Sequence, residues 1–212
     1  MTKMAESEMD NNKALLSGTV SSPMSFSHMM YGEGFYTFKL AVSRLSEYVD
    51  LLPITVSERL LNGRNLTVGA NVIVEGQLRS YNKFIDGANR LILTIFTRDL
   101  YFKDEDEYIQ NPNQIYLNGF LCKPPIYRVT PFKREIADLL IAVNRPYNKS
   151  DYIPAISWGR NARFSQTLNV GDAVAIWGRI QSRPYQKKLD EGQIIERVAY
   201  EVSVSKMESV KK

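Results

Sequence analysis

Residues 168–185 read LNVGDAVAIWGRIQSRPY, and residues 66–83 read LTVGANVIVEGQLRSYNK. The two stretches share a Leu-x-Val-Gly start, an apolar run and a glycine after that run, at an offset of 102 residues. An apolar, β-branched run bounded by glycines is typical of a β-strand. Gly76 and Gly178 occupy equivalent places, which suit either a β-bulge or a plain turn.

The correspondence continues toward the N-terminal side at an offset of 101 residues. Ala41-Val-Ser-Arg44 matches Ala142-Val-Asn-Arg145, and Asp50 matches Asp151. Self-similarity at a nearly fixed offset indicates a duplicated structural unit. We therefore predict two domains, residues 11–103 and 112–208, joined by a short charged linker that ends in Asn-Pro.

Each repeat is predicted to be mostly strand. Strand-like runs with turn signals at modest spacing favour a small closed barrel over a helix bundle. One segment in each repeat, residues 57–66 and 158–168, has apolar residues at helical spacing and few breakers. The predicted fold class is all-β: two tandem five-stranded barrels, each with one short helix.

The composition excludes several classes of protein. Hydrophobic residues make up 44% and charged residues 24%, which is ordinary globular usage. Cys122 is the single cysteine and His28 the single histidine, so an internal disulfide, a Cys-based zinc site and a Ser-His-Asp triad are not expected. No apolar run has membrane length and the start has no secretory h-region. We expect a cytoplasmic binding protein with no catalytic residues, metal or cofactor.

The charge is divided unequally. Residues 1–106 have a net charge of −2 and residues 107–212 a net charge of +6, within a total of +4. An anionic partner is therefore expected on the second half.

The second repeat resembles a known family. Its blocks, in order, are NQIYLNGFL, PPIYR, LIAVNR, DYIPAISWGRNA, LNVGDAVAIWGRIQSRPY and AYEVSV. Their order and spacing over residues 113–206 resemble the bacterial single-stranded DNA-binding proteins, an OB-fold family with a primosomal accessory branch. The first repeat resembles the family more weakly. Two units in one chain resemble the two-barrel bacterial forms, so the resemblance implies tandem OB folds, a homodimer, and a nucleoid-associated role in DNA replication, repair or recombination.

The resemblance also implies which residues contact the nucleic acid. Single-strand binders combine cations along the phosphates with flat aromatic platforms for the bases. The family's stacking positions fall on Tyr147, Tyr152, Trp158 and Tyr185. The cations expected to contact phosphates are Arg128, Arg145, Arg160, Arg183 and Lys187.

The first repeat differs at all four stacking positions, which carry Ser46, Leu51, Ser57 and Lys83. We therefore expect the first barrel to bind nucleic acid more weakly. Tyr48, Tyr81 and Phe84 lie one or two residues away and are the alternative platforms.

Trp177 needs a separate interpretation. Val174 and Ile176 lie an odd number of residues before Trp177 on the predicted strand. The Trp177 side chain therefore points to the face opposite the one that carries Val174 and Ile176. We interpret it as an interface anchor, with base stacking as the alternative. Two other functions stay open: a primosomal accessory protein that mainly bridges replication or primosome proteins, and an RNA-binding OB protein.

Overall fold

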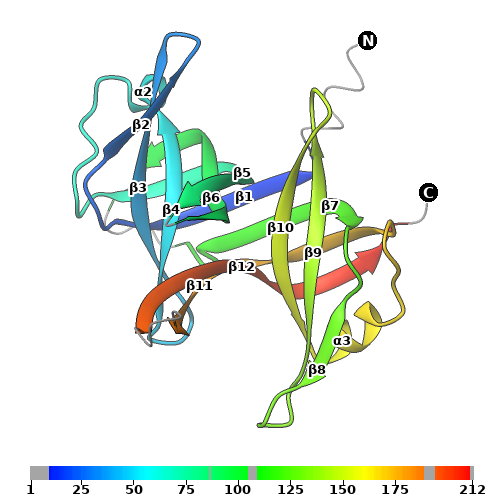
Figure 1. Ribbon diagram of the computed structural model, residues 1–212. Helices are drawn as coiled ribbons and strands as arrows, with labels where there is room; N and C mark the ends of the chain where they lie inside the picture. Colours follow the sequence, from blue (N-terminus) through cyan, green and yellow to red (C-terminus); the bar gives the residue numbers. More distant parts are fainter. Residues whose placement is uncertain (1–9, 86, 105–108, 189–193, 211–212) are drawn as a thin grey trace.

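A computed structural model describes residues 10–85, 87–104, 109–188 and 194–210, without the side chains of residues 187 and 188. The first repeat forms β1 (Asn12–Val20), β2 (Ser25–Met30), β3 (Glu33–Ser43), β4 (Val49–Ser57), α2 (Glu58–Leu61), β5 (Asn71–Ile85) and β6 (Ala88–Phe102). The second forms β7 (Asn113–Leu121), β8 (Ile126–Val129), β9 (Glu135–Arg145), β10 (Lys149–Trp158), α3 (Arg160–Ser165), β11 (Ala173–Lys188) and β12 (Ile194–Ser209). The element order is therefore repeated (Figure 1).

The strand pairing closes two barrels. In the first, β1 pairs with β3 and β5, β3 with β4, β5 with β6, and β4 runs parallel to β6. In the second, β7, β9, β10, β12 and β11 pair in the same way. Each is a five-stranded OB barrel, which confirms the predicted fold class. One short edge strand, β2 or β8, adds to each barrel.

The two equivalent glycines lie at β-bulges. The register between β5 and β6 shifts at Glu75/Gly76, and that between β11 and β12 shifts at Trp177/Gly178. A Cβ at either glycine would collide with the carbonyl oxygen of Phe96 or Ser203 on the neighbouring strand. Only glycine allows this close approach, so the bulge alternative is correct.

The helices are shorter than predicted. The Ser57 side chain accepts a hydrogen bond from the N–H of Arg59 and so caps α2, which ends at Asn62 in the left-handed conformation. In the second repeat, Gly159 precedes α3, and the helix spans six residues. The polar residues that follow both helices leave too little apolar surface to extend them.

The two barrels share one sheet. Strand β1 pairs antiparallel with β7, with Ala14 opposite Ile115, so β6, β5, β1, β7, β11 and β12 are neighbours in one sheet. Figure 1 shows the blue β1 and the green β7 side by side between the two barrels. The sequence repeat did not predict this pairing, because the residue pattern of a strand does not show which other strand pairs with its free edge.

Candidate nucleic-acid interface

The outer face of β10 holds two of the predicted platforms. Alternate residues of a strand share a face, so Tyr152, Pro154, Ile156 and Trp158 lie in one row. Tyr152 is 47% exposed and Trp158 is 37% exposed. The opposite face, with Ile153 and Ala155, belongs to the core of the second barrel. The alternation of the strand therefore presents both aromatic side chains to solvent.

Trp158 lines a groove of about 740 Å³ between the two barrels. We call it the Trp158 groove. The second barrel contributes Arg128, Arg179, Gln181 and Arg183, and the first barrel contributes Arg44 and Tyr48. The structure thus brings Trp158 together with two of the predicted cations.

A second groove continues from the first. The Tyr185 groove lies between the hairpins β5–β6 and β11–β12 and is lined by Tyr185, Arg183, Pro154, Tyr200, Leu91 and Arg90. Arg183 and Glu201 line both grooves. Trp158 and Tyr185 are therefore connected through Arg183 along the surface of the second barrel.

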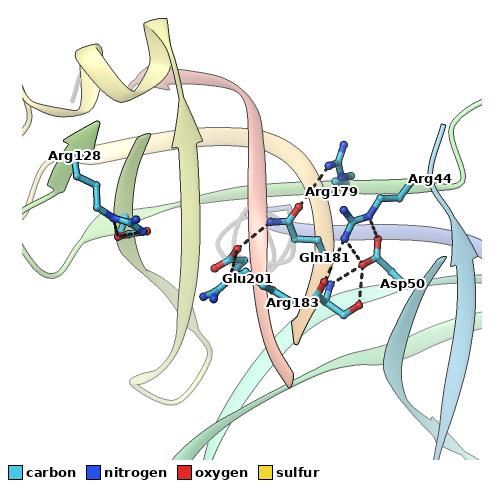
Figure 2. Close-up of polar contacts among 9 residues, drawn as sticks. Arg44, Asp50, Arg128, Arg179, Gln181, Arg183 and Glu201 are labelled. Carbon is cyan, nitrogen blue, oxygen red and sulfur yellow. Dashed lines mark hydrogen bonds and ion pairs between the residues drawn. The ribbon is translucent and has the colours of Figure 1, made fainter. Parts of the chain in front are cut away.

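Two arginines that the second barrel contributes to the Trp158 groove, Arg128 and Arg183, face carboxylates. Arg128 donates to both carboxylate oxygens of Asp138: its Nε and Nη2 lie 3.0 Å and 2.9 Å from Oδ2, and Nη2 also lies 3.2 Å from Oδ1. Arg183 lies 3.5 Å from Glu201, and the Gln181 amide donates to that carboxylate at 2.9 Å. Figure 2 shows these groups along the groove. The carboxylates orient the arginines, and the Arg128 and Arg183 side chains stay more than half exposed to solvent.

At the barrel junction, Asp50 organises the first-barrel side of the groove. Its buried carboxylate accepts two hydrogen bonds of 2.7 Å from Arg44 and one of 2.7 Å from the Ser182 N–H. Burial alone raises the pKa of Asp50, but the bonds from Arg44 and Ser182 outweigh it, so the pKa lies below its usual value. Arg44 in turn stacks 4.9 Å from the ring of Tyr48.

Tyr152 and three other predicted contact residues, Tyr147, Arg160 and Arg145, do not line either groove. Tyr147 is 94% exposed in the turn between β9 and β10, and Arg160 is exposed at the start of α3. Arg145 lies 3.3 Å from Asp151 at the barrel junction, in a small cavity with Arg79. Lys187 is in β11, and its side chain lies outside the described part of the chain.

Trp177 lies on a different surface. It is half-buried, its ring centroid is 5.1 Å from that of Tyr116 on β7, and the Lys206 ammonium lies 4.4 Å from its ring. A hollow of the shared sheet brings both rings together with Lys13, Leu15 and Glu75 of the first barrel. As expected from the alternation of β11, Trp177 points away from the core that holds Val174 and Ile176.

On the first barrel, the matching face is built differently. Leu51 is 48% exposed where Tyr152 stands in the second barrel, and Ser57 replaces Trp158. The His28 ring instead stacks on Phe35 at 5.0 Å, and Phe35 stacks on Phe96 at 5.7 Å. Tyr81 is 48% and Phe84 70% exposed on β5.

Sequence reasoning missed part of the grooves. It named Tyr48 only as a substitute platform, and it did not include Arg44 or Arg90. The match of Arg44 to Arg145 and the Arg-x-Gln-x-Arg spacing around Gln181 were the available signals. Neither signal shows that two barrels meet in one groove.

The fold and grooves define the class: a tandem OB-fold protein of the kind that binds oligonucleotides or oligosaccharides. Comparisons with known proteins narrow this class. A model described as the "Single-strand binding protein family" matches residues 112–210. Single-stranded DNA-binding protein 1 of Streptococcus pyogenes serotype M18 is 30% identical over 96 residues, covering 42% of this chain and 74% of that protein. The chain belongs to the single-strand binding protein family.

Other similarities agree with the fold. The single-stranded DNA-binding protein of Oceanobacillus iheyensis is 33% identical over 81 residues, which cover 35% of this chain and 50% of that protein. The chain thus spans about half the length of several curated relatives. The crystal structure of the wild-type single-stranded DNA-binding protein from Thermus aquaticus has a TM-score of 0.75 at 19% identity, covering 95% of this chain and 93% of that one. This shows that the two-barrel fold is shared. No helix in the described residues has the length and apolar character to cross a membrane.

Proposed function

We propose that this chain binds single-stranded DNA with little dependence on base sequence, in DNA replication, repair or recombination. The observation that carries the proposal is the continuous path from Trp158 through Arg183 to Tyr185 across two connected grooves. Exposed aromatic rings receive unpaired bases of any type, and arginines along the path contact the phosphates. The proposed role is binding, without a catalytic step.

The spacing of the platforms supports a strand that spans several nucleotides. Tyr152 and Trp158 are six residues apart on one strand, which is about 20 Å. They would therefore stack on different bases, and Tyr147 would extend the path beyond Tyr152. Arg128 and Arg183 would exchange their carboxylate partners for phosphate oxygens, which accept forked hydrogen bonds from a guanidinium group.

The salt dependence tests the electrostatic half of this proposal. If about five phosphates are neutralised, a plot of log affinity for oligo-dT against log salt should have a slope of roughly −3.5. Fluorescence anisotropy of a labelled oligonucleotide from low to high salt measures it. Because each contact releases counterions, Arg183→Gln should make the slope less steep by about 0.7.

A slope near zero would contradict the electrostatic mechanism. The same titration with oligo-rU of equal length is the control for the type of nucleic acid. Tighter binding to oligo-rU than to oligo-dT would favour the RNA-binding alternative. Lys123→Gln is the control variant, because Lys123 lies outside both grooves. It should leave the slope unchanged.

We further propose that the second barrel is the main binding surface and the first barrel the weaker one. Two of the four stacking positions on the first barrel, Leu51 and Ser57, offer no flat surface on the face that carries Tyr152 and Trp158 in the second. The first barrel instead adds Arg44 and Tyr48 to the edge of the Trp158 groove. This supports a guiding role for the first barrel at the barrel junction.

The Trp177 face is proposed as the contact between two copies of this chain. Trp177→Asp should convert a dimer into a species with the monomer mass of 24.3 kDa, because a carboxylate beside Tyr116 and Glu75 disfavours an apolar contact. Light scattering after size-exclusion chromatography measures the mass. Trp158→Ala is the control and should stay dimeric, and a monomeric wild type at every concentration would contradict the proposal.

A further inference from the structure

The second-barrel edge that carries Tyr152 is anchored to the first barrel. Strand β10 pairs with β12 only at Ala155 and Ile156, so its edge at Asp151 and Tyr152 is open to β5 of the first barrel. The Tyr152 N–H donates to the Ser80 hydroxyl at 2.7 Å, and the Ser80 N–H donates to the Asp151 carboxylate at 2.7 Å. Two hydrogen bonds to one residue thus hold two successive residues of β10.

This contact is buried and specific. Ser80 is 7% exposed and Asp151 is fully buried. The Asp151 carboxylate also lies 3.6 Å from Arg79 and 3.3 Å from Arg145, but its Oδ2 accepts no hydrogen bond among the described residues. Burial raises the pKa of Asp151 above its usual value. The backbone N–H of Ser80 is therefore a main anchor of this carboxylate.

The anchor matters for the Tyr152 side chain. About half of this side chain is exposed, so protein atoms enclose only part of it. The direction of a partly exposed strand side chain follows from the backbone that carries it. Whatever fixes the backbone at Tyr152 therefore also sets where its ring faces solvent.

The pseudo-equivalent contact on the other side of the junction differs. There Asp50 of the first barrel accepts from the N–H of Ser182 at 2.7 Å and from its hydroxyl at 2.9 Å. The residue after Asp50 is Leu51, which is not a base platform. Ser182 thus makes a comparable contact between the barrels without a bond to an aromatic residue.

We propose that Ser80 of the first barrel is a positioning residue for single-stranded DNA binding, because it holds the backbone of Tyr152 in the second barrel. The proposal rests on the proposed function. Through this contact of Ser80, base stacking on the second barrel depends on the first barrel, even if the first barrel stacks few bases itself.

A double-mutant cycle in the full chain tests this positioning role. Ser80→Ala removes the acceptor of the Tyr152 N–H and should weaken oligo-dT binding roughly two- to tenfold, the range for one lost hydrogen bond. In a Tyr152→Ala background the same change should cause no further loss, because the ring to be positioned is gone. Ser80→Thr keeps the hydroxyl and should restore wild-type affinity within about twofold.

Ser182→Ala is the matched control. It should change the affinity by the same factor with and without Tyr152, since its partner is Asp50. Thermal unfolding reports whether each variant is folded. If Ser80→Ala unfolds, Ser80→Cys, with a similar size and a weak acceptor, carries the same cycle.

These experiments distinguish failure of the positioning role from failure of the proposed function. An equal loss from Ser80→Ala in both backgrounds, or no loss in either, would overturn the positioning role while leaving the proposed function intact. Failure of the wild type to bind oligo-dT even at low salt would overturn the proposed function, and the inference with it.

Discussion

Replacing Trp158 and Tyr185 together by alanine is expected to weaken oligo-dT binding at least about thirtyfold. Each base–aromatic stack contributes about 1–3 kcal/mol, so two lost platforms cost at least about 2 kcal/mol. The two rings lie in separate grooves joined at Arg183, so we expect each ring to receive its own base. Titration of a labelled oligonucleotide at fixed low salt measures the loss.

Trp177→Ala is the control for this double variant. It also removes an aromatic ring, but from the shared sheet rather than from the grooves. It should change the affinity less than about twofold if the platforms are those proposed. A loss from Trp177→Ala as large as that from the double variant would place the nucleic acid on the other face.

Asp50→Asn should lower the free energy of unfolding by about 3 kcal/mol at neutral pH. The change breaks a buried, forked ion pair with Arg44, and the low end of the usual range applies because Arg44 is 21% exposed. The amide oxygen can still accept from Ser182. Urea denaturation of both proteins at pH 7 measures the difference.

The same difference should shrink in acid. The folded-state pKa of Asp50 lies below its ordinary value of 3.8, so its ionisation stabilises the fold above that pH. This contribution is lost as the pH falls from 3.8 through the folded-state pKa. Wild type and variant should therefore converge below pH 3.8, and a gap that stays constant from pH 7 to pH 3 would refute this account of the pair.

Asp151→Asn provides the contrast at the equivalent position. The pKa of Asp151 is raised by burial, so its contribution to stability is present below the ordinary value of 3.8 and declines as the pH rises through the folded-state pKa. A neutral amide avoids that cost. At pH 7 its effect on unfolding should therefore be smaller than that of Asp50→Asn.

The repeat predicted the barrel architecture because strand periodicity and bulge glycines are local properties. Gly76 and Gly178 lie where one strand comes close to its neighbour, which is one of the two alternatives that the sequence left open at these glycines. The helices were overestimated because apolar spacing alone does not show where a cap ends a helix, as Asn62 does.

The binding site was harder to predict from the sequence than the fold. Tyr152 and Trp158 could be placed on one strand face by alternation, but the pairing of β1 with β7 could not be predicted. That pairing brings Arg44 and Tyr48 of the first barrel to the Trp158 groove. The contrast between Asp50 and Asp151, identical residues at matching positions, also depends on partners far away in the chain.

The central claim is that single-stranded DNA lies over Trp158. The most direct test is tryptophan fluorescence during titration with oligo-dT, at low and high salt, for the wild type, Trp158→Ala and Trp177→Ala. Trp158 and Trp177 are the two tryptophans of the chain, so each variant isolates one of them. We expect strong quenching that is retained in Trp177→Ala, lost in Trp158→Ala, and weakened by salt. Quenching that persists in Trp158→Ala and disappears in Trp177→Ala, or no binding even at low salt, would contradict it.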